Sequence, residues 1–346
     1  MRPGAFGLAI GRRGRMIQFT KEKGGAHDMD SVGHPGGNAG SARGRLRAGV
    51  TDAFQRWTDC VRLNLRVARL GLTGRWVSAA DQAASYDRLA PAYNANWLCH
   101  LWPVTRALLD RLPAELPDGP ALDLGCGTGG ATRAILERFP GRPVTAVDLS
   151  AGMLAEARRA VPGSAAVRWI QADMLDFLRG EPPESYALIV SAWAMGYSRS
   201  TQIAREVARV LQPGGIFAYV VNLRDTLPAV RRAFRQTMAR FPQHLRRLAW
   251  MRFPSSAATV NTRLQRRGLN ILWAETSAVT VFPTRDAAGR CLPWLLNTGI
   301  LAGFDAMLPL DQAGPVADAF EQFLGADLEP VAHHYAAAVA HKPCSV

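Results

Sequence analysis

The middle of the chain alternates short apolar runs with stretches of helical periodicity. The runs cover about residues 120–124, 143–148, 166–171, 186–191 and 215–221. Between them, apolar residues recur every three or four positions, which is the spacing of amphipathic helices. Strands that alternate with helices form a parallel sheet with helices on both faces. The pattern therefore predicts a doubly wound α/β sheet.

The first third of the chain divides at about residue 48. Residues 1–48 are rich in Gly, Arg and Ser without periodicity, and we expect a disordered tail there. Residues 49–118 carry a basic amphipathic helix and then a second helix from about Trp97 to Leu112. The apolar side of the first helix consists of Val50, Phe54, Trp57, Val61, Leu65 and Ala68. This helix fits two interpretations, packing on the domain or binding to a membrane surface or partner.

The composition changes after the last apolar run. Residues 222–268 contain eleven arginines and one acidic residue, with a helical apolar stripe among them. The stripe consists of Leu227, Val230, Phe234, Met238 and Phe241. Two further strand-like stretches follow, at residues 269–282 and 330–340. We therefore expect a core over residues 119–221, a basic helical cap inserted at 222–268, and a C-terminal part at 269–346 that returns to the sheet.

The segment A-L-D-L-G-C-G-T-G-G at 121–130 ends the first apolar run. Its glycines allow positive φ and close approach of a ligand, while N–H groups at the start of the next helix point into the same space. Gly125, Gly127 and Gly130 also satisfy the dinucleotide pattern G-x-G-x-x-G, so the glycines alone leave the cofactor open. Asp123 decides, because a carboxylate there repels a pyrophosphate and suits a ligand with an ammonium and a sulfonium. The segment therefore predicts S-adenosylmethionine.

Asp148 closes the second apolar run, 19 positions after Gly129. An acidic residue at about this distance reaches the ribose of an adenosine, and one carboxylate can bind both hydroxyls of a vicinal diol. A helix cap is the alternative interpretation, since a helix begins near Ser150. Together with the glycine segment, the position favours ribose binding.

Two of these segments resemble the motifs of a known family. D-L-G-C-G-T-G at 123–129 and V-D-L-S-A-G-M-L at 147–154 are similar to the first motifs of class I S-adenosylmethionine-dependent methyltransferases. Q-P-G-G at 212–215 resembles the turn into that family's fifth strand, so the resemblance extends from about Tyr86 to Val221. It implies a Rossmann-like sheet of seven strands with an antiparallel last strand, and methyl transfer from S-adenosylmethionine.

The glycine segment and the resemblance together give ten candidates for cofactor binding. By resemblance, Asp173 accepts from the adenine amino group and the N–H of Met174 meets a ring nitrogen, while Met153 lies against the adenine face. Ser191 and Trp193 would border the methionine. Core packing remains an alternative for Met153, and a helix cap for Asp173. The full set is Asp123, Gly125, Cys126, Gly127, Asp148, Met153, Asp173, Met174, Ser191 and Trp193.

The segment Y-D-R-L-A-P-A-Y at 86–93 resembles a lid that folds over the cofactor in similar methyltransferases. The resemblance places Tyr93 near the methionine end, and simple packing of an N-terminal helix is the alternative. We take Tyr93, Tyr197 and His100 as catalytic candidates. A carboxylate nucleophile needs no general base, whereas a phenol or amine could use Tyr197, His100 or His244.

The composition limits the cellular compartments and the binding partners that we expect for this protein. No apolar run reaches the roughly 18 residues needed to cross a bilayer, and we expect a soluble cytoplasmic protein. The five cysteines include no C-x-x-C pair, which argues against a disulfide framework and a metal site. A net charge of +13 is weak support for nucleic acid, because neither N-P-P-Y nor a Pro-Cys pair follows the fourth run.

The cap and the C-terminal part bear on the methyl acceptor. T-L-P at 226–228, W-L-L-N-T-G at 294–299 and the stretch at 330–340 resemble the biotin-pathway methyltransferase that esterifies a malonyl group on acyl carrier protein. The resemblance implies a small or carrier-linked acidic acceptor. The cap arginines suit such an anion, and a solvated basic face is their alternative interpretation. Two other functions stay open: methylation of a natural product or quinone at O, N or C, and a non-catalytic module that binds S-adenosylmethionine.

Overall fold

The structure is a computed structural model that describes residues 58–163, 166–249, 252–325 and 331–344. The tail expected over residues 1–48 and the start of the expected basic helix lie outside these ranges. Within them, the basic helix runs over residues 58–72.

Seven strands form a single mixed sheet in the order β3-β2-β1-β4-β5-β7-β6. β1 to β5 are joined by parallel pairing, and β7 is antiparallel to both of its neighbours. The predicted doubly wound sheet with an antiparallel last strand is therefore confirmed. The strands span Ala121–Leu124 (β1), Val144–Asp148 (β2), Val167–Gln171 (β3), Tyr186–Ala192 (β4), Leu211–Asn222 (β5), Asn270–Val281 (β6) and Val331–His341 (β7).

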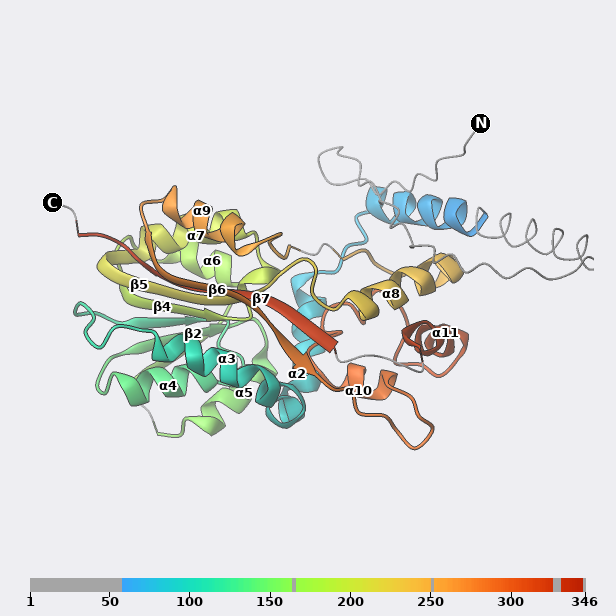
Figure 1. Cartoon of the computed structure of the whole chain (residues 1–346), viewed down its shortest axis with the longest axis horizontal. Helices are drawn as coiled ribbons and strands as arrows, with labels where there is room; N and C mark the ends of the chain where they lie inside the picture. The colour runs from blue at the N-terminus through green and yellow to red at the C-terminus, as the bar shows by residue number, and fades with distance from the viewer. Residues whose placement is uncertain (1–57, 164–165, 250–251, 326–330, 345–346) are drawn as a thin grey trace, which may run out of the picture.

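Helices cover both faces of the sheet, which is why the central strands read as continuous apolar runs. β1 and most of β4 are buried throughout. One face carries α3 (Cys99–Asp110), α4 (Gly130–Arg138) and α5 (Ala151–Ala160). The other carries α6 (Met174–Gly180), α7 (Ser200–Val210) and α9 (Ala257–Gln265). Figure 1 shows the two helical layers on opposite sides of the strands.

The helix expected from about Trp97 to Leu112 is not a separate helix but continues directly from the preceding one. The chain runs from α2 (Ala79–Tyr93) through a π-helical turn, η1 (Asn94–Leu98), directly into α3. π-helical turns inside α-helices occur frequently at functional sites. This one places the buried Trp97 between α2 and α3.

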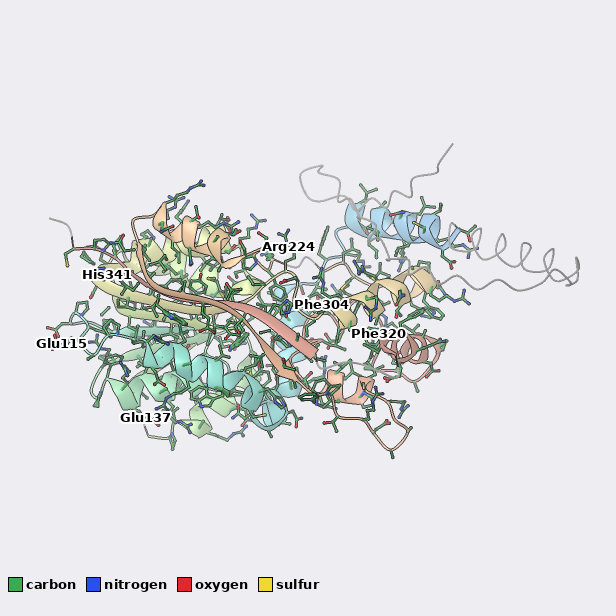
Figure 2. The ribbon with its side chains drawn as sticks, viewed as in Figure 1. Glu115, Glu137, Arg224, Phe304, Phe320 and His341 are labelled. Carbon is green, nitrogen blue, oxygen red and sulfur yellow. The ribbon has the colours of Figure 1, made fainter. Side chains whose placement is uncertain are left out.

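A cap lies beyond one end of the sheet and is built from α8 (Pro228–Arg240), η3 (Pro242–His244), α10 (Leu292–Leu296) and α11 (Pro315–Leu324). α8 packs on α11 through the ring of Phe234, whose centroid lies 5.5 Å from that of Phe320 and 6.4 Å from that of Phe304. Figure 2 shows Phe304 and Phe320 together in this cap, with Arg224 at its boundary with the sheet.

The packing divides the chain differently from the expected boundary at residues 222–268. α9 belongs to that segment but packs on α7 and β6 of the sheet. α10 and α11 lie in the expected C-terminal part but join α8 in the cap. The difference arises because the apolar faces of helices from both segments pack against one another. The sequence shows that each helix has an apolar face but not which helix it packs against.

Candidate functional site

The glycine loop links β1 to α4 at the edge where the parallel strands end. Gly125, Gly127 and Gly129 have φ angles of 82°, 52° and 81°, a region that favours glycine. A Cβ at Gly125 would lie 2.2 Å from the Cβ of Ala194, so a side chain is excluded there. A Cβ at Gly127 would have no atom within 4 Å, which means that this part of the loop faces open space.

The N–H groups in the first half of the loop, before the helix begins, are already bonded within the protein. Gly125 and Cys126 both donate to the carbonyl of Val147, at 2.8 and 2.9 Å. Gly127 donates to Oδ2 of Asp148 at 2.8 Å. These donors already have acceptors at the end of β2. The first half of the loop therefore leaves space for a ligand but provides few free N–H groups to bind it.

Asp123 at the end of β1 is fully buried. Its Oδ2 accepts from the hydroxyl of Thr132 at 2.6 Å, while its Oδ1 has no partner in the described part of the chain. Burial raises the pKa of Asp123 to about 7. A buried carboxylate oxygen without a donor fits a cationic ligand such as the ammonium of S-adenosylmethionine, because buried polar atoms are nearly always satisfied. The residue therefore fits the cofactor that the sequence predicts.

Asp148 at the end of β2 has a structural role that the sequence only partly predicted. Its Oδ2 accepts from the loop at Gly127, and its Oδ1 accepts from the N–H of Ser150 at 2.9 Å. Burial raises its pKa. Each carboxylate oxygen keeps a second lone pair, so binding of the ribose diol is compatible with these bonds and stays a prediction.

Three tyrosines gather above this edge. The hydroxyls of Tyr86 on α2 and Tyr197 after β4 are 2.6 Å apart, and the rings of Tyr86 and Tyr93 have centroids 6.1 Å apart. Phe253 lies against Tyr197 with centroids 6.2 Å apart. Burial raises the pKa of all three tyrosines, so they remain neutral phenols. They can wall the site and donate hydrogen bonds, but they are poor general bases.

Asp87, which was not predicted as a site residue, ties α2, the helix that carries the predicted lid segment, to the start of α5. Its Oδ1 accepts from the Ser150 hydroxyl at 2.5 Å and from the N–H of Gly152 at 2.8 Å. A Cβ at Gly152 would lie 2.9 Å from the Cα of Asp87. The signal was available in the pair Tyr86-Asp87, whose tyrosine faces the site while the aspartate caps the start of α5.

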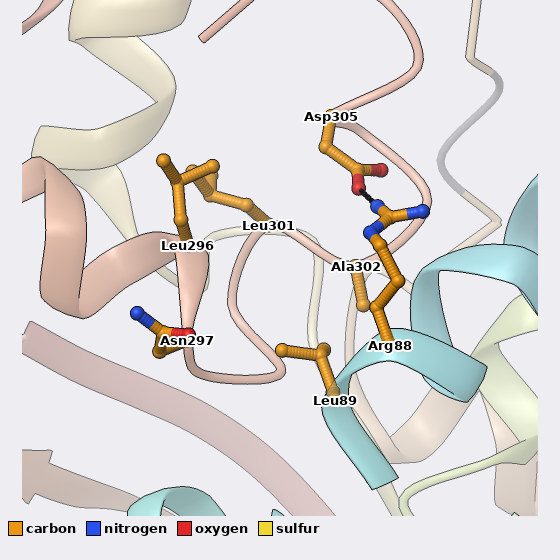
Figure 3. A pocket seen from close by; sticks show the side chains of 7 residues that line it. All are labelled: Arg88, Leu89, Leu296, Asn297, Leu301, Ala302 and Asp305. Atoms are coloured by element: carbon orange, nitrogen blue, oxygen red, sulfur yellow. Dashed lines mark hydrogen bonds and ion pairs between the residues drawn. The ribbon is translucent and has the colours of Figure 1, made fainter. Parts of the chain in front are cut away.

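Asp305 holds the same lid from the side of the cap. Its carboxylate accepts from the hydroxyl of Ser85 at 2.7 Å and forms an ion pair with Arg88. Figure 3 shows this pair at a cavity on the seam between α2 and the chain after α10. The cavity is lined by Arg88, Leu89, Leu296, Asn297, Leu301, Ala302 and Asp305. α2 is thus tied both to the sheet domain and to the cap.

Two predicted cofactor residues turn their side chains into the protein. The Ser191 hydroxyl donates to the carbonyl of Leu124 at 2.9 Å and is fully buried. The indole N–H of Trp193 donates to the hydroxyl of Thr105 on α3 at 3.0 Å, and its ring packs edge-on against Tyr335. Trp193 adopts φ of 63°, so the chain turns sharply here. Both side chains stabilise the edge of the site, and their contact with a cofactor stays a prediction.

The residues predicted to contact the adenine have positions that suit both of their interpretations, contact with the adenine and a structural role. Asp173 caps α6, its Oδ1 accepting from the N–H groups of Leu175 at 2.8 Å and Asp176 at 3.2 Å. Met153 is 2% exposed and contributes to the core beneath α5. Met174 Cε would lie 3.6 Å from a Cβ at Gly125, which puts this side chain beside the loop.

His100 is exposed on α3 and packs only at 6.2 Å, centroid to centroid, from the ring of Trp97. His244 is exposed in η3 of the cap. The structure therefore brings Tyr93 and Tyr197 together with Tyr86 but does not bring either histidine into that cluster. A different histidine, His333 of β7, is buried near Trp97 at this edge.

In the part of the chain that the structure describes, no helix is long and apolar enough to cross a membrane. The same residues contain no group of three or more His, Cys, Asp or Glu side chains that could hold a metal ion.

Comparison with known proteins places this site in a family. Residues 121–215 match a family described as a methyltransferase domain. Trans-aconitate 2-methyltransferase of Methylobacterium nodulans is 32% identical over 224 residues, which cover 63% of this chain and 78% of that protein. The enzyme of the same name from Rhizobium meliloti is 30% identical over 216 residues, covering 61% and 80%. The fold and the site thus define an α/β enzyme of the methyltransferase class.

The chain belongs to the S-adenosylmethionine-dependent methyltransferases. A shorter match is malonyl-[acyl-carrier protein] O-methyltransferase of Enterobacter lignolyticus, 39% identical over 159 residues, which cover 44% of this chain and 58% of that protein. Among solved structures, geranyl diphosphate C-methyltransferase from Streptomyces coelicolor is similar with a TM-score of 0.41 and 19% identity, over 68% of this chain and 77% of that one. The cofactor of this chain is S-adenosylmethionine, as its sequence predicted.

Proposed function

We propose that this enzyme transfers the methyl group of S-adenosylmethionine to a carboxylate oxygen of an acidic acceptor, either a small acid or an acid carried on acyl carrier protein. The observation that carries the proposal is a group of three neighbouring arginines where the chain passes from the sheet into the cap: Arg224 shortly after β5, and Arg231 and Arg235 on α8. The acceptors for which the relatives are named, trans-aconitate and malonyl-acyl carrier protein, are also acids.

The arginine group is arranged as an anion site would be. Arg231 is partly buried, and its guanidinium donates to the backbone carbonyl of Arg224. Burial and the charge of Arg235 lower the pKa of Arg231. In the described part of the chain no carboxylate forms an ion pair with any of the three, and the nearby Asp225 is paired with His334 instead. Asp225 offsets part of this positive charge, but three arginines beside one carboxylate leave an excess of positive charge that favours an anionic ligand.

The chemistry needs little from the protein beyond placement. When bound, S-adenosylmethionine would supply a methyl group on a sulfonium; the acceptor oxygen takes this methyl group in line, and the S–CH3 bond breaks to leave neutral S-adenosylhomocysteine. A carboxylate with a pKa of about 4 to 5 is already ionised at neutral pH, so no general base is required. The neutral tyrosines around Tyr197 can donate to one carboxylate oxygen and orient the other, and the lid excludes water. A phenol acceptor, by contrast, would need a base that these tyrosines do not supply.

The test uses charge reversal on α8. Arg231→Glu combined with Arg235→Glu should raise the KM for an acidic acceptor at least tenfold while changing the Kd for S-adenosylmethionine by less than about threefold. Acceptors are trans-aconitate, malonyl-acyl carrier protein and a hydroquinone, with methyl transfer followed by mass spectrometry.

Arg240→Glu, exposed at the far end of the same helix, is the matched control. An unchanged acceptor KM in the double variant, or the same rise in the control, contradicts the arginine site. Methylation of the hydroquinone alone contradicts carboxylate chemistry.

A further inference from the structure

His333 carries an unused hydrogen-bonding atom at the edge of the site. It is the third residue of β7 and lies beyond the last pair that this strand forms with β5, which joins Asn222 to Tyr335. Its side chain is 3% exposed, and its Nε2 has no partner in the described part of the chain. An imidazole nitrogen left unpaired in the interior is costly, so it indicates a partner that binds there.

The other ring nitrogen fixes what kind of partner this is. Nδ1 of His333 lies 3.3 Å from Oδ1 of Asn222, the last residue of β5. A carboxamide oxygen only accepts, so Nδ1 carries the proton and Nε2 presents a lone pair. The atom that faces the unsatisfied position is therefore a hydrogen-bond acceptor, and its partner must donate.

A second buried atom without a partner belongs to the adjoining turn. Thr226 is 1% exposed, and its Oγ1 has no partner among the described residues. The next residue, Leu227, donates its N–H to the carbonyl of Ala332 at 3.0 Å, which joins the turn to β7 directly before His333. Leu227 adopts a left-handed φ of 55°, so the turn is held in a conformation that an L-residue rarely takes.

The wall opposite His333 is formed by the lid segment. The ring of Trp97, in η1, lies 4.8 Å from the ring of His333, centroid to centroid. A Cβ at Gly299, in the chain after α10, would lie 2.6 Å from that indole and 3.3 Å from the ring of Tyr93. The corner made by His333 and Thr226 is therefore continuous with the tyrosine cluster through Trp97 and Tyr93.

A catalytic base is excluded at this corner. Burial lowers the pKa of His333 to about 3, and the neighbouring His334 adds to the effect. A general base works best when its pKa is near the operating pH, and an imidazole with a pKa this far below neutral pH has little tendency to accept a proton. The imidazole is suited to recognition in its neutral form.

We propose that His333 and Thr226 form a recognition corner for a hydroxyl group on the methyl acceptor, so that the preferred acceptor is a hydroxy acid. A hydroxyl bound between them would satisfy both atoms, because it can donate to Nε2 of His333 and accept from the hydroxyl of Thr226. An amide N–H would satisfy only the first. The proposal rests on the proposed carboxylate acceptor and adds a second group to it.

The test measures binding without turnover. Matched acids that differ in one hydroxyl, citrate against tricarballylate and tartronate against malonate, are titrated into the full enzyme saturated with S-adenosylhomocysteine, which cannot donate a methyl group. We expect at least one pair to show about tenfold tighter binding of the hydroxy acid. His333→Phe and Thr226→Val should each reduce this preference, to near unity for His333→Phe, while His333→Gln keeps an acceptor oxygen and retains part of it.

His334→Phe is the matched control, since His334 is the next residue of β7 and pairs with Asp225 at 3.1 Å. It should leave the preference unchanged. Thermal melting of each variant shows whether it is folded, and the ¹⁵N shift of Nε2 in the wild type should be that of an unprotonated nitrogen that moves when the hydroxy acid binds.

Equal binding within both pairs, including absence of binding, overturns the proposal, as does a preference that persists in His333→Phe. Methyl transfer is assayed separately with S-adenosylmethionine. A preference that depends on His333 without any carboxylate methylation would sink the proposed function and leave the corner in place. Carboxylate methylation without such a preference would support the proposed function and overturn the recognition corner.

Discussion

At the scale of single residues, the predicted cofactor site contains buried carboxylates whose pKa is raised by burial. Asp123 is the clearest case, with one carboxylate oxygen bonded to Thr132 and the other without a donor. Its pKa of about 7 means that the empty protein holds this residue protonated about half of the time at neutral pH. A cation that binds beside it selects the ionised form.

The consequence is a pH dependence of cofactor affinity. The Kd for S-adenosylmethionine should fall by about tenfold between about pH 6 and pH 8, because the ionised fraction of Asp123 rises by that factor across a pKa of 7. Isothermal titration across this range measures it. Asp123→Asn should bind more weakly and show a much flatter profile, and an equally steep profile in that variant would assign the dependence to another group.

The same shift acts on stability with the opposite slope. Between about pH 4 and pH 7 the folded protein keeps a proton on Asp123 that the unfolded chain has lost. The free energy of unfolding without cofactor therefore falls as pH rises through this window. Asp148, whose pKa burial also raises, contributes to the same slope, so the part of the slope that Asp123→Asn removes is the part that belongs to Asp123.

At the scale of elements, the lid helix α2 is held at both of its sides. Asp87 joins it to the start of α5, and Asp305 joins it to the cap. The two ties differ in burial, because Ser85 is 2% exposed whereas the Arg88 side chain is 63% exposed. The buried hydroxyl bond should therefore matter more than the exposed ion pair.

Asp305→Ala should loosen the lid. We expect a loss of about 1 to 2 kcal/mol of stability, because the hydroxyl of Ser85 loses its carboxylate partner. We also expect faster hydrogen exchange in α2 and a several-fold higher Kd for S-adenosylmethionine. Arg88→Ala is the control, with an expected cost below about 1 kcal/mol. Equal effects of the two changes would mean that the ion pair, not the buried hydroxyl, holds the lid.

At the scale of the whole molecule, the charge is distributed for an acidic partner. The net charge is +13, and residues 222–268 alone contain eleven arginines. Those of α8 lie on the cap, and Arg224 lies where the cap meets the sheet (Figure 2). Long-range attraction of this kind acts mainly on the rate of encounter with an acidic acceptor and is screened by salt.

Raising the salt concentration to about 0.5 M should lower kcat/KM for an acidic acceptor by roughly tenfold or more. The Kd for S-adenosylmethionine should change far less, since the predicted site is lined by buried carboxylates and is expected to be covered by the lid segment, and buried charges are screened little by salt. Stopped-flow or steady-state kinetics at matched pH measures the first, and titration measures the second. If kcat/KM does not change with salt, the arginines do not attract the acceptor and form only a solvated basic face.

The sequence by itself determined the strand and helix order, the glycine loop and the cofactor class. These follow from local rules, because strand periodicity, positive φ at glycine and the position of a carboxylate after a strand are written in neighbouring residues. The carboxylates Asp123 and Asp148 were found for the same reason. The helix cap at Asp173 was foreseen as an alternative because capping is also local.

Only the tertiary structure decided which of the remaining residues face the site. Ser191 lies near the end of β4 and Trp193 follows that strand, but their hydrogen-bond partners on β1 and α3 turn both side chains inward. His100 has the right chemistry and lies exposed, whereas His333 stands in an apolar strand and meets Asn222 and Trp97 from two distant segments. The physical reason is that burial and the lack of a hydrogen-bond partner depend on groups brought together by folding, and no local pattern records them.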